Sequence, residues 1–154
     1  MEANPIPKGY HSVNPYLTAS NATLLVEFIL KAFDGTERER ILRPDGSIMH
    51  TEVRIGDSLV MVGEPRGEWK PQPSMLYLYV ADVDTIYLQA LAAGGESILA
   101  PNTTFWGDRT ACVKDFANNQ WWIATRRENL KPDEVQKRAN AFFEQMAKNT
   151  ASVE

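Results

Sequence analysis

The chain has few of the residues that most often carry metal or thiol chemistry. One cysteine, Cys112, and two histidines, His11 and His50, occur among 154 residues. A single cysteine excludes an internal disulfide and any metal cluster built on several thiolates. Cys112 stands inside an expected strand, where a lone cysteine is usually a small buried apolar residue rather than a nucleophile.

Long apolar runs and an excess of basic residues are also missing. No stretch approaches the roughly 18 to 20 apolar residues of a membrane-spanning helix, and "MEANPIPKGYHSV" lacks the apolar core of a secretory signal. A net charge of −4 offers no basic face for nucleic acid or an anionic membrane. We therefore expect a cytoplasmic protein with neither a nucleic-acid nor a membrane partner.

What the chain does contain is one pattern that occurs twice. A strand precedes a helix capped by Ser20 or Asn21, and the turn "RPDGS" then separates two of three further strands. After a proline-rich stretch the same order returns, with Asp82 at the start of the second helix. Setting Ser20 on Asp82 aligns "YLTAS" with "LYVAD", a repeat of about 60 residues.

The repeat predicts an α+β fold. Two tandem βαβββ modules form curled mixed sheets around a cavity, because one module alone leaves its sheet uncovered. The expected organisation is an N-terminal arm (1–9), a first module (10–64), a linker (65–74), a second module (75–127), and a C-terminal helix and tail (128–154).

The tail has the pattern of an amphipathic helix. Pro132 and Asp133 suit a helix N-terminus, and an apolar stripe follows them. The stripe comprises Val135, Ala139, Phe142, Phe143 and Met146. We expect this helix to pack either on its own sheet or on a partner subunit.

Paired βαβββ modules make residues 10–127 resemble the vicinal oxygen chelate superfamily, which includes glyoxalase I, extradiol dioxygenases and bleomycin- and fosfomycin-resistance proteins. Its PhnB-like branch is similar through "HSVNPYL", "IMHTEVRIGDS", "FWGDR" and "DFANNQWWIAT". The last segment resembles the family's Asp-Pro-x-Gly-Asn turn and final strand. Phe116 replaces the proline and Asn118 the glycine, and asparagine tolerates the left-handed conformation that such a turn needs.

The resemblance implies four metal-ligand positions, two in each module. Counting from the helix caps and aligning the final strands places them on Asn14, Val60, Leu76 and Trp122. Only Asn14 offers a ligand atom, whereas a catalytic metal site usually needs three protein ligands. We therefore expect no metal and no other cofactor.

The same register sorts the strand residues by the period of two. Those expected to face the cavity are Asn14, Tyr16, His50, Glu52, Val60, Val62, Leu76, Leu78, Trp106, Asp108, Thr110, Cys112 and Trp122. Those expected to face the helices are Leu17, Val53, Leu59, Met61, Tyr79, Trp121 and Ile123. A mostly apolar cup with a few polar groups is typical of a small-molecule site. Trp69 in the linker either covers this cup or shields an exposed edge.

Two polar pairs are candidates for chemistry. His50 and Glu52 share a face and suit general acid-base catalysis. Alternatively His50 bonds a neighbouring strand and Glu52 pairs with Arg109 or Arg54. Asp108 and Arg109 point to opposite faces, so either Asp108 orients a polar ligand group or each residue makes its own structural ion pair.

Three functions remain open. The leading hypothesis is a metal-free homodimeric protein that binds a small amphipathic or aromatic organic molecule against Trp106 and Trp122, as the resemblance to bleomycin-resistance proteins implies. The second is a lyase or isomerase of the same superfamily that uses His50 and Glu52, with or without a divalent metal. The third is an interaction module whose cup is filled by its own side chains.

Overall fold

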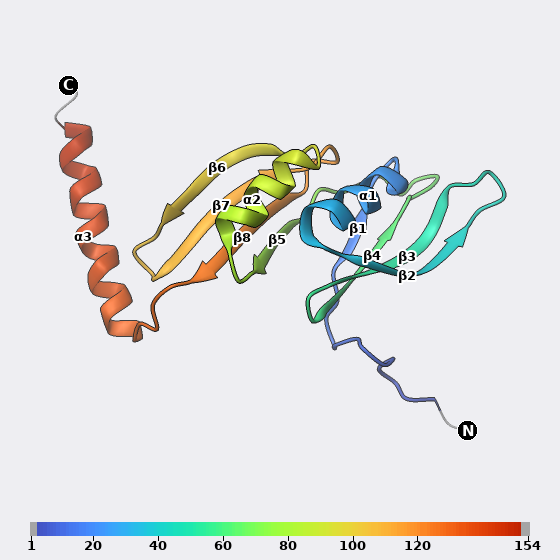
Figure 1. Ribbon diagram of the computed structural model, residues 1–154, viewed down its shortest axis with the longest axis horizontal. Helices are drawn as coiled ribbons and strands as arrows, with labels where there is room; N and C mark the ends of the chain where they lie inside the picture. The colour runs from blue at the N-terminus through green and yellow to red at the C-terminus, as the bar shows by residue number, and fades with distance from the viewer. Residues whose placement is uncertain (1–2, 152–154) are drawn as a thin grey trace.

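A computed structural model describes residues 3–151 of the chain (Figure 1). Its elements are β1 (Tyr16–Thr18), α1 (Ala22–Phe33), β2 (Thr36–Leu42), β3 (Ile48–Ile55), β4 (Ser58–Gly63), β5 (Met75–Tyr79), α2 (Val83–Ala92), β6 (Glu96–Thr103), β7 (Asp108–Lys114), β8 (Gln120–Arg126) and α3 (Pro132–Ala151). The strand orders β1-β4-β3-β2 and β5-β8-β7-β6 are equivalent, and the first pair in each is parallel. The predicted α+β fold of two βαβββ modules and a C-terminal helix is confirmed.

Local capping fixes where both module helices begin. The side chain of Asn21 accepts a hydrogen bond of 3.1 Å from the Leu24 N–H, so α1 starts at Ala22. In the second module Asp82 does the same for α2, at 3.1 Å from the Asp84 N–H. Of the two predicted caps of the first helix, Asn21 is therefore the one used.

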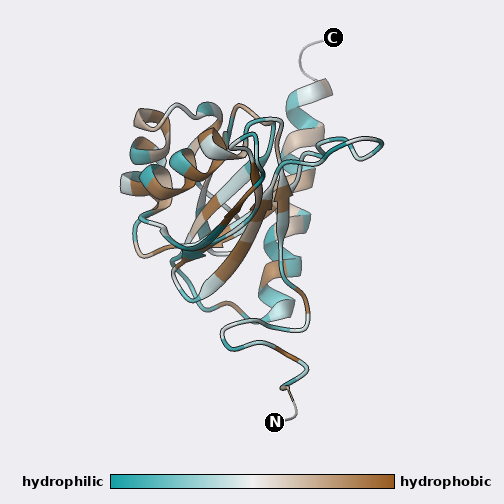
Figure 2. Cartoon of the chain, turned by 90° about the vertical axis from the view of Figure 1, so that its right-hand side faces the viewer, coloured by the Kyte–Doolittle hydropathy of each residue, from teal (hydrophilic) through white to brown (hydrophobic). Residues whose placement is uncertain are grey.

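The two modules share one hydrophobic core. In Figure 2, α1 and α2 lie together on one side of the sheets. Trp121 of β8 is 1% exposed, and its ring centroid lies 4.6 Å from that of Phe33 and 6.4 Å from that of Phe28, both in α1. Its predicted core position is confirmed, and it joins the second module's sheet to the first module's helix.

The sheet faces turned away from α1 and α2 form what we call the open face. On β4 the predicted assignment to the two faces is wrong. Val62 is aligned with the core residue Leu17, and Val60 and Val62 both belong to the buried core beneath α1. Leu59 and Met61 consequently point to the open face. A shift of one residue exchanges the faces of a whole strand.

The prediction for β5 fails in the same way. Leu76 is aligned with Trp121, and both Leu76 and Leu78 pack against the core. Tyr79, expected beneath a helix, lies on the open face together with Tyr77.

The cause of both errors is the choice of helix cap. The prediction set Ser20 on Asp82, whereas the structure places Asn21 at the equivalent cap. The correct repeat is one residue shorter than the predicted one, so Tyr16 corresponds to Tyr77 and not to Leu78. Each lies on the strand that enters its module, with its side chain on the open face.

The C-terminal helix α3 begins at Pro132, as predicted, and stands beyond the edge of the second sheet (Figure 1). None of its described residues is buried, so packing on its own sheet, one of its two expected placements, is not what the structure shows. Arg138 holds its first half in place through two hydrogen bonds of 2.8 and 2.9 Å to Glu128. Within residues 3–151 no helix is both long and apolar enough to cross a membrane.

Candidate functional site

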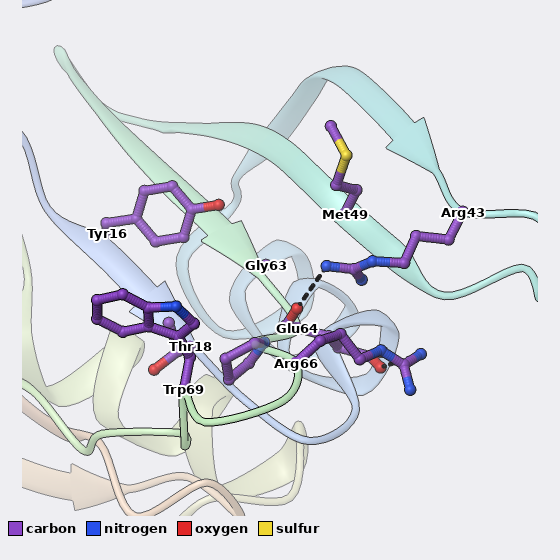
Figure 3. A pocket seen from close by; sticks show the side chains of 9 residues that line it. Tyr16, Thr18, Arg43, Met49, Gly63, Glu64, Arg66 and Trp69 are labelled. Atoms are coloured by element: carbon purple, nitrogen blue, oxygen red, sulfur yellow. Dashed lines mark hydrogen bonds and ion pairs between the residues drawn. The ribbon is translucent and has the colours of Figure 1, made fainter.

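A cavity of about 390 Å³ lies on the open face of the first sheet, at the end of β1 and β4 (Figure 3). Tyr16 of β1 and Trp69 of the linker form one side of it, and Met49 faces them from β3. Trp69 lines this cavity but is 80% exposed, so its indole lies at the rim. Its two predicted roles, covering the cup and shielding an exposed edge, stay predictions.

The other end of the cavity is polar. Arg43 donates hydrogen bonds to the carbonyl oxygens of Ile48, at 3.1 Å, and of Glu64, at 2.8 Å. Arg66 lies beside it, 2.8 Å from the Asp45 carboxylate and 3.7 Å from that of Glu64. The cavity thus offers aromatic surface at one end and guanidinium groups at the other.

Two backbone features create this space. Ile41 is aligned with His50 and Leu42 with Ile48, so Met49 is an extra residue that bulges from β3. A Cβ atom at Gly63 would lie 2.7 Å from both the Tyr16 hydroxyl and the Met49 carbonyl oxygen. Only glycine therefore leaves room for the Tyr16 ring here. Gly63 was not among the residues predicted from the sequence, although a glycine inside an alternating strand indicates the close approach of another group to the backbone.

The Tyr16 hydroxyl connects the cavity to the predicted acid-base pair. It lies 3.3 Å from Nδ1 of His50, whose Nε2 is 4.0 Å from a carboxylate oxygen of Glu52. Glu52 accepts a hydrogen bond from Tyr10 and lies 3.5 Å from Arg38. The structure thus brings His50 and Glu52 together, but the predicted Glu52 partners Arg109 and Arg54 are wrong.

The N-terminal arm covers this polar chain from outside. A Cβ atom at Gly9 would lie 3.3 Å from Leu59 and from Arg54, so the arm lies against the open face there. Burial and the hydrogen bond to Glu52 raise the pKa of Tyr10 to about 12. Glu52 is therefore buried beneath the arm, and His50 is the member of the pair that is nearer to the cavity.

The second sheet adds an aromatic surface to the open face. Trp122 is aligned with Tyr77 and Cys112, which confirms that it faces away from the helices. Tyr79 donates a hydrogen bond of 3.0 Å to Asp108, and this bond raises the pKa of Tyr79. Asp108 thus lies on the predicted face, but its carboxylate is engaged and 4% exposed.

A second cavity, of about 400 Å³, joins the two sheets between β1 and β5. Tyr16 and Tyr77 both line it, together with Pro15 and Met75. Tyr16 therefore borders both cavities. Trp106 lies in the turn before β7, where its ring contacts that of Phe105 at a centroid distance of 4.9 Å.

Two predicted residues take no part in the site. Burial raises the pKa of the Cys112 thiol to about 11, as expected for a small buried residue rather than a nucleophile. Arg109 forms hydrogen bonds of 2.7 Å to both carboxylate oxygens of Asp84, and the Asp84 pKa is lowered as a result. Arg109 thus makes the structural ion pair that was one of its two predicted roles.

The four positions compared with metal ligands do not make a metal site. Asn14 accepts the His11 N–H at 3.0 Å and donates to the His11 carbonyl, so its side chain closes a local turn. Val60 and Leu76 face the core. With Asn21 set on Asp82, Met75 is the equivalent of Asn14, and Met61 is the equivalent of Trp122. None of these four has the carboxylate or imidazole that zinc, nickel or iron usually binds.

The rest of the described chain also lacks a set of metal ligands. Among residues 3–151, no three His, Cys, Asp or Glu side chains gather closely enough to hold a metal ion. The residues present therefore do not fit the divalent metal that related folds use.

Two tandem βαβββ modules, each with a mixed four-stranded sheet, define the class of fold, and comparison with known proteins gives the family. Residues 13–123 match the Glyoxalase/Bleomycin resistance protein/Dioxygenase superfamily, and the chain belongs to that superfamily. An uncharacterised protein of Mycobacterium tuberculosis is 29% identical over 136 residues, which cover 81% of this chain and 80% of that protein.

Solved structures agree on the fold. TioX from Micromonospora sp. ML1 has a TM-score of 0.64 at 20% identity, over 75% of this chain and 99% of that one. A putative 3-demethylubiquinone-9 3-methyltransferase, a PhnB protein from Bacillus cereus, has a TM-score of 0.60 at 13% identity, over 75% and 99% of the two chains. The expected likeness to PhnB-like members is confirmed at the level of the fold.

Proposed function

We propose that the protein binds a small, planar, amphipathic organic molecule in the cavity between Tyr16 and Trp69, without a metal ion. The observation that carries the proposal is the pair of aromatic rings on one side of a 390 Å³ cavity, which is within the usual size range of ligand sites. Aromatic rings offer large contact areas at a small cost in side-chain entropy. They therefore suit the capture of a flat molecule.

The polar end of the cavity supports an acidic or electron-rich group on the ligand. Arg43 gives its hydrogen bonds to carbonyl oxygens, so its positive charge is not cancelled by the groups it contacts there. The Arg66 charge is shared with Asp45 and Glu64. A carboxylate, sulfonate or carbonyl group of the ligand would therefore be oriented towards Arg43.

Trp122, against which the ligand was predicted to bind, lies at the outer limit of the proposed site. Tyr16 also lines the second cavity, whose other side is formed by Tyr77, and Tyr77 is aligned with Trp122. A ligand larger than the first cavity would extend in that direction. Contact of a ligand with Trp106 and Asp108, which lie further along the second sheet, stays a prediction.

The test is a fluorescence titration with 8-anilinonaphthalene-1-sulfonate, a probe with a flat naphthalene ring and one anionic group. We expect saturable binding that Trp69→Ala weakens by about 10-fold, the worth of one aromatic stacking contact. Trp122→Ala should weaken it by less than about 3-fold, since Trp122 lies at the limit of the site. Leu88→Ala is the control, because this exposed apolar side chain lies on α2, on the opposite side of the sheets from the cavity (Figure 2). Equal affinity for wild type and Trp69→Ala would contradict the proposal.

A second candidate function is proton transfer by an enzyme of the same superfamily. The observation that favours it is the chain of contacts from the Tyr16 hydroxyl through His50 to Glu52, which links the cavity to a carboxylate. His50 would accept or donate the proton, and Glu52 would orient the imidazole. It is the second candidate because the Glu52 carboxylate already accepts a hydrogen bond from the Tyr10 hydroxyl and lies beside Arg38.

The superfamily's glyoxalase chemistry provides the assay for this alternative. The hemithioacetal of methylglyoxal and glutathione is the probe substrate, and formation of the thioester is followed by absorbance. The enzyme hypothesis predicts turnover that His50→Gln abolishes while the melting temperature stays within about 2 °C. The binding proposal predicts no turnover by wild type above the uncatalysed rate.

A further inference from the structure

One buried carboxylate of the second module has no positively charged partner. Asp108 is 4% exposed, and its side chain accepts a hydrogen bond of 3.0 Å from the Tyr79 hydroxyl. None of the ion pairs formed within residues 3–151 includes Asp108. Burying a carboxylate is costly unless its charge is compensated. The Tyr79 hydroxyl is neutral and leaves most of the acceptor capacity of Asp108 unused.

The basic residue aligned with Asp108 is bound elsewhere. Arg126 of β8 lies opposite Asp108 in the register, but its guanidinium donates to the Glu128 carbonyl oxygen at 3.3 Å and to the Asn129 side chain at 3.2 Å. These two bonds tie Arg126 to the segment that follows β8. The negative charge of Asp108 is therefore available to a cation from outside the chain.

A second polar group on the same face of β7 also lacks a partner. Thr110 is 1% exposed, and its hydroxyl oxygen has no hydrogen-bond partner among the described residues. It follows Asp108 by two residues, so the two side chains lie on one face of the strand, roughly 7 Å apart. One nitrogen atom with hydrogen bonds of about 2.9 Å to each side chain bridges most of that distance.

The residues around these two polar groups are small at the centre and aromatic at the border. Ala124 is aligned with both Thr110 and Tyr79, so the three side chains share the open face. Thr110 and Ala124 are buried, although no helix lies on that side of the sheet. The larger rings beside them, Tyr77 and Tyr79, have centroids 5.4 Å apart. Large side chains therefore cover the small ones on this part of the face.

The aromatic rings meet at Asp108. Its hydrogen bond is the main reason why the pKa of Tyr79 is raised. Partial burial raises the pKa of Tyr77, whose hydroxyl also lies near the Trp106 indole, which lowers that pKa, and near Asp108, which raises it. The faces of aromatic rings carry partial negative charge and attract organic cations. Rings and a carboxylate in one place are thus complementary to a cation that is partly apolar.

We propose that the second module binds an organic ammonium ion with at least one N–H group, for which Asp108 and Thr110 are the hydrogen-bond acceptors. The rings of Tyr77 and Tyr79 lie beside the alkyl groups and the charge. A quaternary ammonium ion has no N–H and would leave the Thr110 hydroxyl without a donor. A metal ion suits the site less well, because one carboxylate and one neutral hydroxyl are too few protein ligands.

This site goes beyond the proposed function, because it selects the opposite charge. The cavity between Tyr16 and Trp69 has Arg43 and Arg66 at its polar end and suits an anionic group. The ammonium site lies on the second sheet and contains an uncompensated carboxylate. The two sites are therefore tested with different probes.

The first test is a saturation-transfer NMR titration of the full chain with cyclohexylmethylammonium, a cation without a flat ring. We expect saturable binding, and binding of neutral cyclohexylmethanol that is at least about 30-fold weaker. Asp108→Asn should weaken the cation by the same factor. Asp84→Asn is the matched control, because it removes the same charge from the same module but from a carboxylate that is paired with Arg109. Absence of saturable binding, or equal affinity for wild type and Asp108→Asn, would overturn the proposal.

The second test uses Thr110→Val, which removes only the hydroxyl. Because this hydroxyl has no partner in the described chain, the variant should melt at or above the temperature of wild type. We expect its affinity for cyclohexylmethylammonium to be about 10-fold lower, whereas the exposed control Thr36→Val should be unchanged. Wild type should also prefer this probe over its trimethylated counterpart by at least about 10-fold. Equal affinities in either comparison would show that the Thr110 hydroxyl does not read an N–H group.

The outcome is separable from that of the proposed function. Asp108→Asn and Thr110→Val should bind 8-anilinonaphthalene-1-sulfonate as wild type does, because neither residue lines the cavity beside Trp69. Failure of that anionic probe with the ammonium probe still bound would contradict only the proposed function. The reverse result would contradict only the ammonium site.

Discussion

Asp115 is the residue on which the turn before β8 depends. It is 2% exposed, and its carboxylate accepts hydrogen bonds from the Ala117 and Asn119 backbones and from the Trp121 indole, the last at 2.8 Å. Asn118 follows in the left-handed conformation, with φ 64°, as the sequence predicts. This turn fixes which of the two adjacent tryptophans enters the core and which reaches the open face.

Replacing Asp115 should therefore cost more stability than any surface change. Asp115→Ala leaves several buried donors without an acceptor, and we expect a loss of about 3 kcal/mol in the free energy of unfolding. Urea denaturation followed by tryptophan fluorescence measures it. Asp57→Ala, in an exposed turn, is the control and should change the value by less than about 0.5 kcal/mol. A cost for Asp115→Ala as small as the control's would show that the turn does not depend on this carboxylate.

Tyr10 makes the stability of the protein sensitive to alkaline pH. Its pKa in the folded chain is about 12, above the ordinary value of 10.0, so the folded state holds this proton more tightly than the unfolded chain does. The resulting stabilisation is complete below pH 10 and is lost as the pH rises towards 12. Tyr10→Phe removes this contribution. Urea midpoints measured from pH 8 to 11 should fall less steeply for the variant, and parallel curves would contradict the assignment.

At the scale of the element, β4 and β5 show how much the sequence could predict. The period of two identified the strands and placed Trp121 and Trp122 on the correct faces. The faces of β4 and β5 were exchanged because Ser20 and Asn21 are both good caps, and only the tertiary structure selects Asn21. Because the predicted repeat was one residue too long, Val60 and Leu76 were assigned to the cavity, although both side chains face the core.

The corrected register of β4 can be tested by mutation. Val60→Ala removes two buried methyl groups from the core beneath α1, and we expect a loss of about 2 kcal/mol in the free energy of unfolding. Affinity for 8-anilinonaphthalene-1-sulfonate should remain within about 2-fold of wild type. If Val60→Ala strongly weakened binding of the probe and left the free energy of unfolding unchanged, Val60 would face the cavity as first predicted and not the core.

The cavity itself could not be predicted from the sequence. It needs the Met49 bulge, the missing side chain at Gly63 and the path of the linker that brings Trp69 to Tyr16. None of these follows from an alternating pattern, since bulges and linker paths are decided by contacts between distant segments. The predicted pair of His50 and Glu52 was found because both residues lie on one regular strand.

At the scale of the whole molecule, the two modules are joined on the helix side and open on the other. One continuous core lies beneath α1 and α2, whereas the opposite side carries exposed aromatic residues from both sheets. The fold is therefore stabilised from the helix side, and aromatic side chains stay accessible on the other side. The cavity that we propose as the ligand site lies over the first sheet.

The most direct test of the binding proposal is a crystal structure with 8-anilinonaphthalene-1-sulfonate bound. The account predicts electron density for the probe within about 4 Å of the Tyr16 and Trp69 rings, the distance of apolar contact. Its sulfonate should lie at the Arg43 end of the cavity. Density for the probe only at another site, with the cavity between Tyr16 and Trp69 empty, would contradict the account.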